Sequence, residues 1–144
     1  MLRYFLNEDL VTDILPVVRK LMKNKLAMIR RKSLLLIYNM YQKYPHLIED
    51  IKELAVVGLS DPEVPVLFGA LSVLKQLIAF DPISFKNQTG KLAEILGKVI
   101  DHKYPPEYDY HKVPAPWIQI DLLRMLEQLG HNDMNQSKLM YDVL

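Results

Sequence analysis

The segment Met28–Tyr44 carries the hydrophobic pattern of an amphipathic helix, and later parts of the chain repeat it. Its apolar residues stand three or four positions apart, which places them on one helical face: Leu34, Ile37, Tyr38 and Tyr41. Pro45 is expected to end this helix, because proline lacks a backbone N–H and restricts the residue before it.

Val64–Phe80 repeats this arrangement further along the chain. Ala70 follows Ser33, and Pro82 follows Pro45, by the same 37 positions. A period of this size in helical sequence is typical of stacked helix pairs. The sequence therefore predicts an all-α fold of HEAT/armadillo-like type, a right-handed α-α superhelix (solenoid) of about three to four helix pairs.

Composition limits what such a chain can be. It has 144 residues, half of them hydrophobic, which is enough for one domain with a real core. The formal net charge of +1 argues against binding polyanions such as nucleic acid by bulk charge. No cysteine is present, which excludes disulfides and thiolate metal sites. No signal-peptide pattern or membrane-length apolar run occurs, so we expect a soluble intracellular protein.

Proline, glycine and apolar periodicity predict the element boundaries. Helices are expected over residues 9–24, 26–44, 45–57, 61–80, 83–86, 91–100 and 117–129. Pro16 predicts a kink in the first helix, or a start nearer Leu15, and Gly58 is expected to form a C-terminal cap. Asn87–Gly90 is expected to interrupt the helices on either side.

Residues 101–116 hold four prolines among aromatic and charged residues, which rules out a regular helix. They predict an irregular but ordered surface insertion, pinned by its tyrosines: Tyr104, Tyr108 and Tyr110. The insertion displaces a third copy of the helical pattern, Trp117–Leu129.

Both ends of the chain carry apolar residues with no polar outer face. Leu2–Leu6 and Leu139–Leu144 would expose such residues, although terminal repeats of a solenoid need a polar surface. We therefore expect residues 1–144 to be a single solenoid segment, internal to a longer stack. Its ends are expected to make the isolated segment self-associate.

The most unusual charge pattern is a stretch without acidic residues between Asp13 and Glu49. The basic window is the set of cations that clusters in this stretch: Arg19, Lys20, Lys23, Lys25, Arg30, Arg31 and Lys32. It is either a patch for an anionic surface or an acidic partner, or a solvated helical face with an arginine paired to the next repeat. The second interpretation is favoured.

No arrangement of residues supports catalysis, metal binding or a cofactor. The histidines do not pair at metal-ligand spacing: His46, His102, His111 and His131. The serines lack a nucleophile-elbow context, and the glycines form no phosphate loop. Trp117 is either an interface anchor or a packing residue that holds the insertion, and the packing role is favoured.

The stretch Val113–Asp133, VPAPWIQIDLLRMLEQLGHND, resembles a segment of the large-chain adaptins of clathrin-type adaptor complexes. The run IRRKSLLL within Ala27–Leu36 and the terminal SKLMYDVL resemble two further segments of the same trunk, in the same order. The tyrosine-rich insertion and the VPAPW junction look most like the epsilon branch of the family, followed by the gamma and alpha branches. Lys138 departs from the glutamate that many members carry there.

This resemblance implies an α-solenoid trunk in a scaffold for vesicle-mediated transport. It implies partnership with small, medium and beta-type large adaptor chains, and recruitment by an Arf-type GTPase. It also implies a cytoplasmic location, peripheral on trans-Golgi network and endosomal membranes. The alternatives are a generic HEAT-type binding module, such as a transport receptor segment, and an anionic-membrane binder that uses the basic window.

Overall fold

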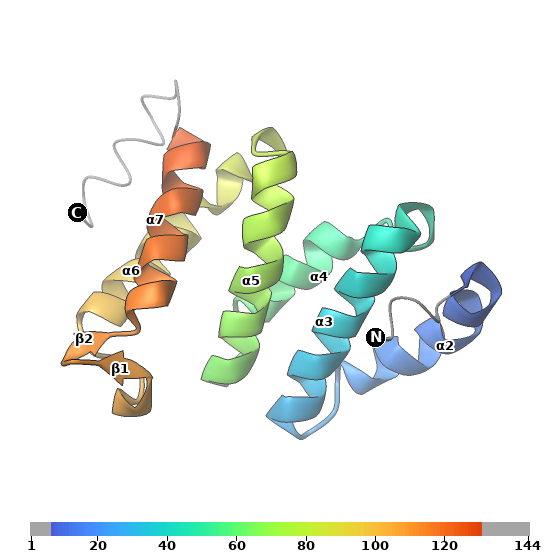
Figure 1. The fold of residues 1–144 in the computed structure, drawn as a ribbon, viewed down its shortest axis with the longest axis horizontal. Coiled ribbons are helices and arrows are strands. Elements are labelled where there is room, and N and C mark those ends of the chain that lie inside the picture. Colours follow the sequence, from blue (N-terminus) through green and yellow to red (C-terminus); the bar gives the residue numbers. More distant parts are fainter. Residues whose placement is uncertain (1–6, 131–144) are drawn as a thin grey trace. The chain divides into compact units, whose positions relative to one another are not determined.

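The computed structural model describes residues 7–130, in which helices form nearly all of the secondary structure. This part of the chain contains six α-helices, which Figure 1 labels: α2 (Glu8–Leu21), α3 (Ala27–Lys43), α4 (Ile51–Gly58), α5 (Val64–Phe80), α6 (Thr89–Ile100) and α7 (Pro116–Gly130). The predicted all-α fold is confirmed. The terminal segments expected to carry exposed apolar residues lie outside the described residues.

The repeat predicted from sequence appears directly in the helix boundaries. α3 and α5 are each 17 residues long, and α5 begins and ends 37 positions after α3. Each helix is followed by a proline and a short 3₁₀ helix, η1 (Pro45–Leu47) or η2 (Ile83–Gln88). The equivalence of Pro45 and Pro82 is therefore structural as well as sequential.

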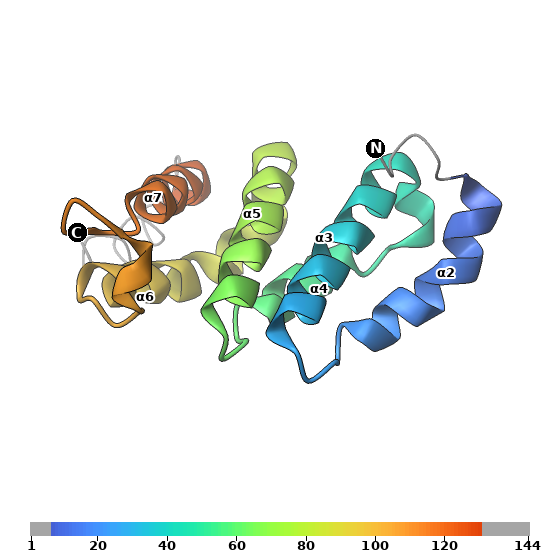
Figure 2. The ribbon, with the colours of Figure 1, turned by 60° about the horizontal axis from the view of Figure 1, so that its bottom comes forward.

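Contacts divide the chain into two compact units, with the boundary between Leu74 and Lys75, inside α5. In the first unit α3 packs against α2 and α4, and α2 and α3 lie side by side in both views (Figures 1 and 2). The side chains at the centre of this unit are apolar and fully buried: Val11, Leu34, Ile37, Met40, Ile48, Ile51 and Ala55. In the second unit α6 packs against α7, and both contact η2. Its centre is formed by Phe85, Leu92, Ile95, Leu96, Val99, Leu122, Met125 and Leu129.

The prediction of one helix over residues 45–57 is wrong at its start. Pro45 opens only the three residues of η1, and the non-helical backbone of Ile48, with φ −132° and ψ 70°, breaks the helix there. This break lets Ile48 point into the core and leaves Asp50 at the N-terminus of α4.

The first helix also differs from its expected bounds, because α2 starts at Glu8 after the Asn7 cap and passes through Pro16. The alternative start near Leu15 is therefore wrong.

Gly58 has a different role from the expected C-terminal cap. It is the last residue of α4, and Leu59 follows it with an ordinary right-handed φ of −67°. A β-carbon added to Gly58 would lie 2.7 Å from the β-carbon of Ala70 and 3.4 Å from a methyl group of Leu34. The glycine is therefore needed for the close approach of α4 to α5, not for the turn.

The expected interruption at Asn87–Gly90 is also wrong. η2 runs directly into α6, and the Thr89 hydroxyl donates a 2.9 Å hydrogen bond to the Lys86 carbonyl at the junction. Thr89 is fully buried, so this bond satisfies its hydroxyl within the protein.

The insertion before α7 is ordered and contains a small hairpin. After η3 (Pro106–Tyr108), the strands β1 (Asp109–Tyr110) and β2 (Val113–Pro114) pair antiparallel. His111 and Lys112 form the turn with φ values of 51° and 67°, the left-handed region that two-residue hairpin turns require. Tyr110 is exposed beside the His111 ring, so it does not pin the insertion as expected.

Candidate functional site

Two arginines of the basic window are held by acidic residues from the next repeat. Arg19 on α2 donates two hydrogen bonds, of 2.6 and 2.7 Å, to the two carboxylate oxygens of Asp50. These bonds raise the pKa of Arg19 and lower the pKa of Asp50 below its ordinary value of 3.8. The pair is bidentate, the geometry that makes arginine–carboxylate contacts specific.

Arg30 on α3 forms a second bidentate pair, with Asp61. Its Nε and Nη2 donate hydrogen bonds of 2.9 and 3.1 Å to the carboxylate, and its Nη1 donates to the backbone carbonyls of Asn24 and Lys25. Burial by itself raises the pKa of Asp61, but the hydrogen bonds from Arg30 and from the Glu63 amide outweigh it and hold the pKa below 3.8. Both pairs join residues 31 positions apart.

Arg31 uses its aliphatic stem for packing. Its Cγ lies 3.2 Å from the position that a β-carbon on Gly69 would take, so the stem covers a glycine of α5. The remaining cations of the window are exposed: Lys20, Lys23, Lys25 and Lys32. Between residues 7 and 130, no hydrogen bond or ion pair engages the ammonium group of any of these four lysines.

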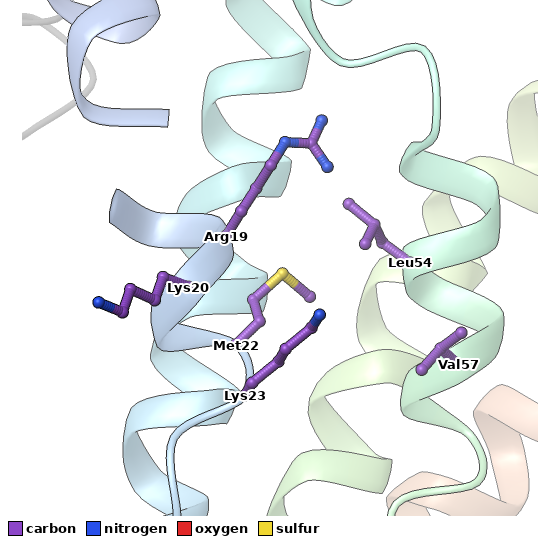
Figure 3. A pocket seen from close by; sticks show the side chains of 6 residues that line it. All are labelled: Arg19, Lys20, Met22, Lys23, Leu54 and Val57. Atoms are coloured by element: carbon purple, nitrogen blue, oxygen red, sulfur yellow. The ribbon is translucent and has the colours of Figure 1, made fainter. Parts of the chain in front are cut away.

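The structure brings part of the window together around a hollow of about 520 Å³ between α2 and α4. Arg19, Lys20, Met22 and Lys23 line it from one side, and Leu54 and Val57 line it from the other. Figure 3 shows Arg19, Met22 and Lys23 extending toward α4, whereas Lys20 points away from it. Lys25, Arg30, Arg31 and Lys32 do not line the hollow.

Sequence reasoning missed the α4 side of this hollow and the two aspartates. Leu54 and Val57 carry no chemical signal of their own, and their position depends on how α4 packs. The aspartates could have been found, since both arginine–aspartate pairs share the 31-residue spacing.

Trp117 lies at the start of α7 and is 47% exposed. Ile120 and Leu123 follow at intervals of three residues and are also exposed, so they share one face of the helix. We call Trp117, Ile120 and Leu123 the α7 stripe. The neighbouring Ile118 and Leu122 are buried, which separates the packed face of α7 from this outer face.

The histidines that the structure describes do not gather into a site. His46 contacts Glu8 at 2.7 Å, and His102 lies 3.7 Å from Asp109. No group of three or more histidine, aspartate or glutamate side chains suited to a metal ion occurs in residues 7–130. Over the same residues, no helix combines the length and the apolar character that crossing a membrane requires.

Stacked helices in which α5 repeats α3 after 37 positions are typical of a HEAT/armadillo-like helical-repeat protein. Residues 1–144 match the family model for the adaptin N-terminal region, and the chain belongs to this family. The resemblance to large-chain adaptins is thereby confirmed, and the helical repeats belong to an adaptin trunk.

Several curated relatives carry names from adaptor complexes. The chain is 35% identical to human AP-4 complex subunit epsilon-1 over 136 residues, which cover 94% of this chain and 12% of the relative. It is 32% identical to the AP-4 complex subunit epsilon of Arabidopsis thaliana over 143 residues, covering 96% of this chain and 15% of the relative. It is 31% identical to the AP-1 complex subunit gamma of Dictyostelium discoideum over 135 residues, covering 92% and 15%. The chain thus spans less than one sixth of the length of each of these relatives.

Proposed function

We propose that this chain is a scaffold segment of an epsilon-type large subunit of a vesicle-coat adaptor complex. The observation that carries the proposal is the family match over all 144 residues, together with the similarity to subunits named epsilon in two organisms. In this role the segment acts in intracellular membrane trafficking through protein–protein contacts and not by catalysis. Residues 1–144 serve as one stretch of the trunk.

The internal construction of the described residues supports a structural role. Arg19 and Arg30 form ion pairs with Asp50 and Asp61, which lie at the starts of the following helices. These charged side chains therefore stabilise the connections between helices. The buried side chains are almost all apolar, and the buried polar ones, Ser33 and Thr89, bond to backbone carbonyls. Such an arrangement holds a shape and offers surfaces to partners.

The proposed partners are the small, medium and beta-type large chains of an adaptor complex, with an Arf-type GTPase for recruitment. The proposed location is cytoplasmic, on the surface of trans-Golgi network or endosomal membranes. The names of the relatives support assembly with other adaptor chains, because each is named as the subunit of a complex.

Affinity purification of the full protein that carries this chain tests the proposal. We expect mass spectrometry to recover small, medium and beta-type adaptor chains that a tag-only control does not recover. Recovery of unrelated partners, with none of these chains, would overturn the proposal and favour a generic HEAT-type module such as a transport receptor.

We also propose that Trp117 anchors a contact between the α7 stripe and another adaptor chain. Tryptophan is enriched among the residues that dominate interface energies, and the stripe presents it beside Ile120 and Leu123. Replacing Trp117 and Ile120 by alanine should lower recovery of at least one adaptor chain. Phe80→Ala is the matched control, because Phe80 is an exposed aromatic residue outside the stripe. Equal recovery from both variants would argue for a packing role.

A further inference from the structure

The hollow between α2 and α4 combines an apolar lining with uncompensated positive charge. Met22, Leu54 and Val57 supply the apolar lining, and Val57 is 69% exposed although it belongs to a core helix. Met22 and Leu54 are half-buried beside it. Solvent-accessible apolar side chains grouped in a concavity are typical of binding sites. The hollow is therefore a candidate site for a ligand with an apolar part.

The charge at the hollow comes mainly from Lys23, with Lys20 at its edge pointing away from α4. Arg19 also lines it, but Asp50 neutralises Arg19 through two short hydrogen bonds. Lys20 and Lys23 have no such partner among residues 7–130, and Lys23 extends toward α4 beside the apolar lining (Figure 3). None of the described lining residues is acidic. The hollow therefore complements a ligand that carries negative charge next to its apolar part.

We propose that this hollow binds an amphipathic segment of a partner protein, with aliphatic side chains against Met22, Leu54 and Val57 and a neighbouring aspartate or glutamate on Lys23. Amphipathic helices commonly bind in grooves between helices in this way, with their apolar side chains as anchors. Lys20 lies on the outer side of the same helix end and supplies a second contact for a further carboxylate.

A lipid surface fits these observations less well. Recognition of anionic membranes usually takes clusters of about four to eight lysines or arginines, whereas two unpaired lysines line this hollow. A flat layer of headgroups would also leave the concave apolar lining in water, at a cost that an inserted aliphatic side chain avoids. The proposal does not depend on the trafficking role, because it rests on the geometry of the hollow alone.

Selection from a random 16-residue peptide library displayed on phage, with the intact chain as the target, tests the proposal. We expect selected peptides to share aliphatic residues at helical spacing with adjacent aspartate or glutamate. Fluorescence anisotropy with the best labelled peptide should show at least about tenfold weaker binding to Lys23→Glu and to Val57→Glu. Because both side chains are exposed, neither substitution should unfold the chain, and circular dichroism checks this.

Matched controls separate the hollow from general charge and apolarity. Lys32→Glu reverses an exposed lysine outside the hollow, and Val17→Glu changes an exposed valine of α2 that does not line it. Both should bind the peptide like the parent chain. Selection of no peptide, or equal weakening by the control variants, would overturn the proposal. So would sedimentation with phosphatidylserine vesicles that Lys23→Glu abolishes, in the absence of peptide binding, because it would assign the site to lipid.

Discussion

The guanidinium group of Arg30 donates two hydrogen bonds to the carboxylate of Asp61. Its remaining nitrogen donates to two backbone carbonyls in the turn between α2 and α3. Asp61 in turn accepts a 2.9 Å hydrogen bond from the Glu63 amide at the start of α5. One arginine therefore fixes the turn that enters its own helix to the turn that enters the equivalent helix of the next repeat.

The first prediction concerns the relative strength of the two arginine–aspartate pairs. The Arg30 and Asp61 side chains are 17% and 13% exposed, whereas those of Arg19 and Asp50 are 34% and 45% exposed. Because solvent weakens exposed pairs, Arg30→Ala should lower the thermal unfolding midpoint more than Arg19→Ala. Arg30→Lys should restore little, since an ammonium group cannot reproduce the fork geometry. A smaller loss for Arg30→Ala than for Arg19→Ala would contradict this account.

The second prediction follows from the lowered pKa values of Asp50 and Asp61. Above the ordinary value of 3.8, both carboxylates are charged in the folded and unfolded chain, and the ion pairs contribute fully. As the pH falls below that value the unfolded chain takes up protons first, so stability is lost until the pH passes the lower pKa of the folded state. Urea unfolding at a series of pH values from about 5 downward measures this loss.

In the same titration Asp61→Asn should lose less stability on acidification than the parent chain, because one of the protonating groups is gone. The double variant with Asp50→Asn should lose less again. An Asp61→Asn curve parallel to that of the parent would show that this carboxylate does not contribute to acid sensitivity.

The third prediction uses three glycines in different surroundings. Gly58→Ala should destabilise the chain by about 1–3 kcal/mol, because the new methyl group would overlap Ala70. Gly90→Ala should stabilise it by about 0.5 kcal/mol, since a β-carbon there meets nothing within 4 Å and the residue lies in α6. Gly69→Ala should fall between them, because the flexible stem of Arg31 can move aside. Chemical unfolding measures all three, and a stable Gly58→Ala would contradict the close approach of α4 and α5.

The fourth prediction concerns the hairpin tip, where His111 and Lys112 both have positive φ. Left-handed backbone costs about 1–2 kcal/mol at most residues, whereas asparagine and glycine adopt it readily. His111→Asn with Lys112→Gly should therefore raise the free energy of unfolding by about 1 kcal/mol. Lys103→Gly is the control, since Lys103 is exposed in the same insertion without positive φ, and it should bring no gain.

The structural features that the sequence predicted best are the ones that depend on neighbouring residues. Apolar spacing and proline placed both ends of α3 within one residue and the end of α5 at Phe80, although α5 begins three residues later than expected. These signals work because amphipathic periodicity and a missing N–H act within one helix. Prediction from sequence failed where a residue's role depends on a side chain that is distant in the sequence. Local preference predicted that Gly58 caps a helix, but the approach of Ala70 determines its role. The hairpin was missed because His111-Lys112 lacks the residues that usually mark such a turn.

The candidate site was predicted in the same uneven way. The basic window was visible in the sequence, and so was the alternative that an arginine pairs with the next repeat. Which arginines pair, and which lysines meet an apolar lining, depends on the packing of α4. The role of Trp117 could not be fixed either, since its exposure depends on how the insertion folds.

The two arginine–aspartate pairs also change what the acid-free stretch presents to its surroundings. Asp50 and Asp61 lie outside that stretch in sequence and reach its arginines only through folding. In the unfolded chain the same stretch is a linear polycation, which attracts heparin or nucleic acid by charge alone. Retention on heparin at low salt should therefore increase when the chain unfolds, because folding neutralises Arg19 and Arg30 of this stretch.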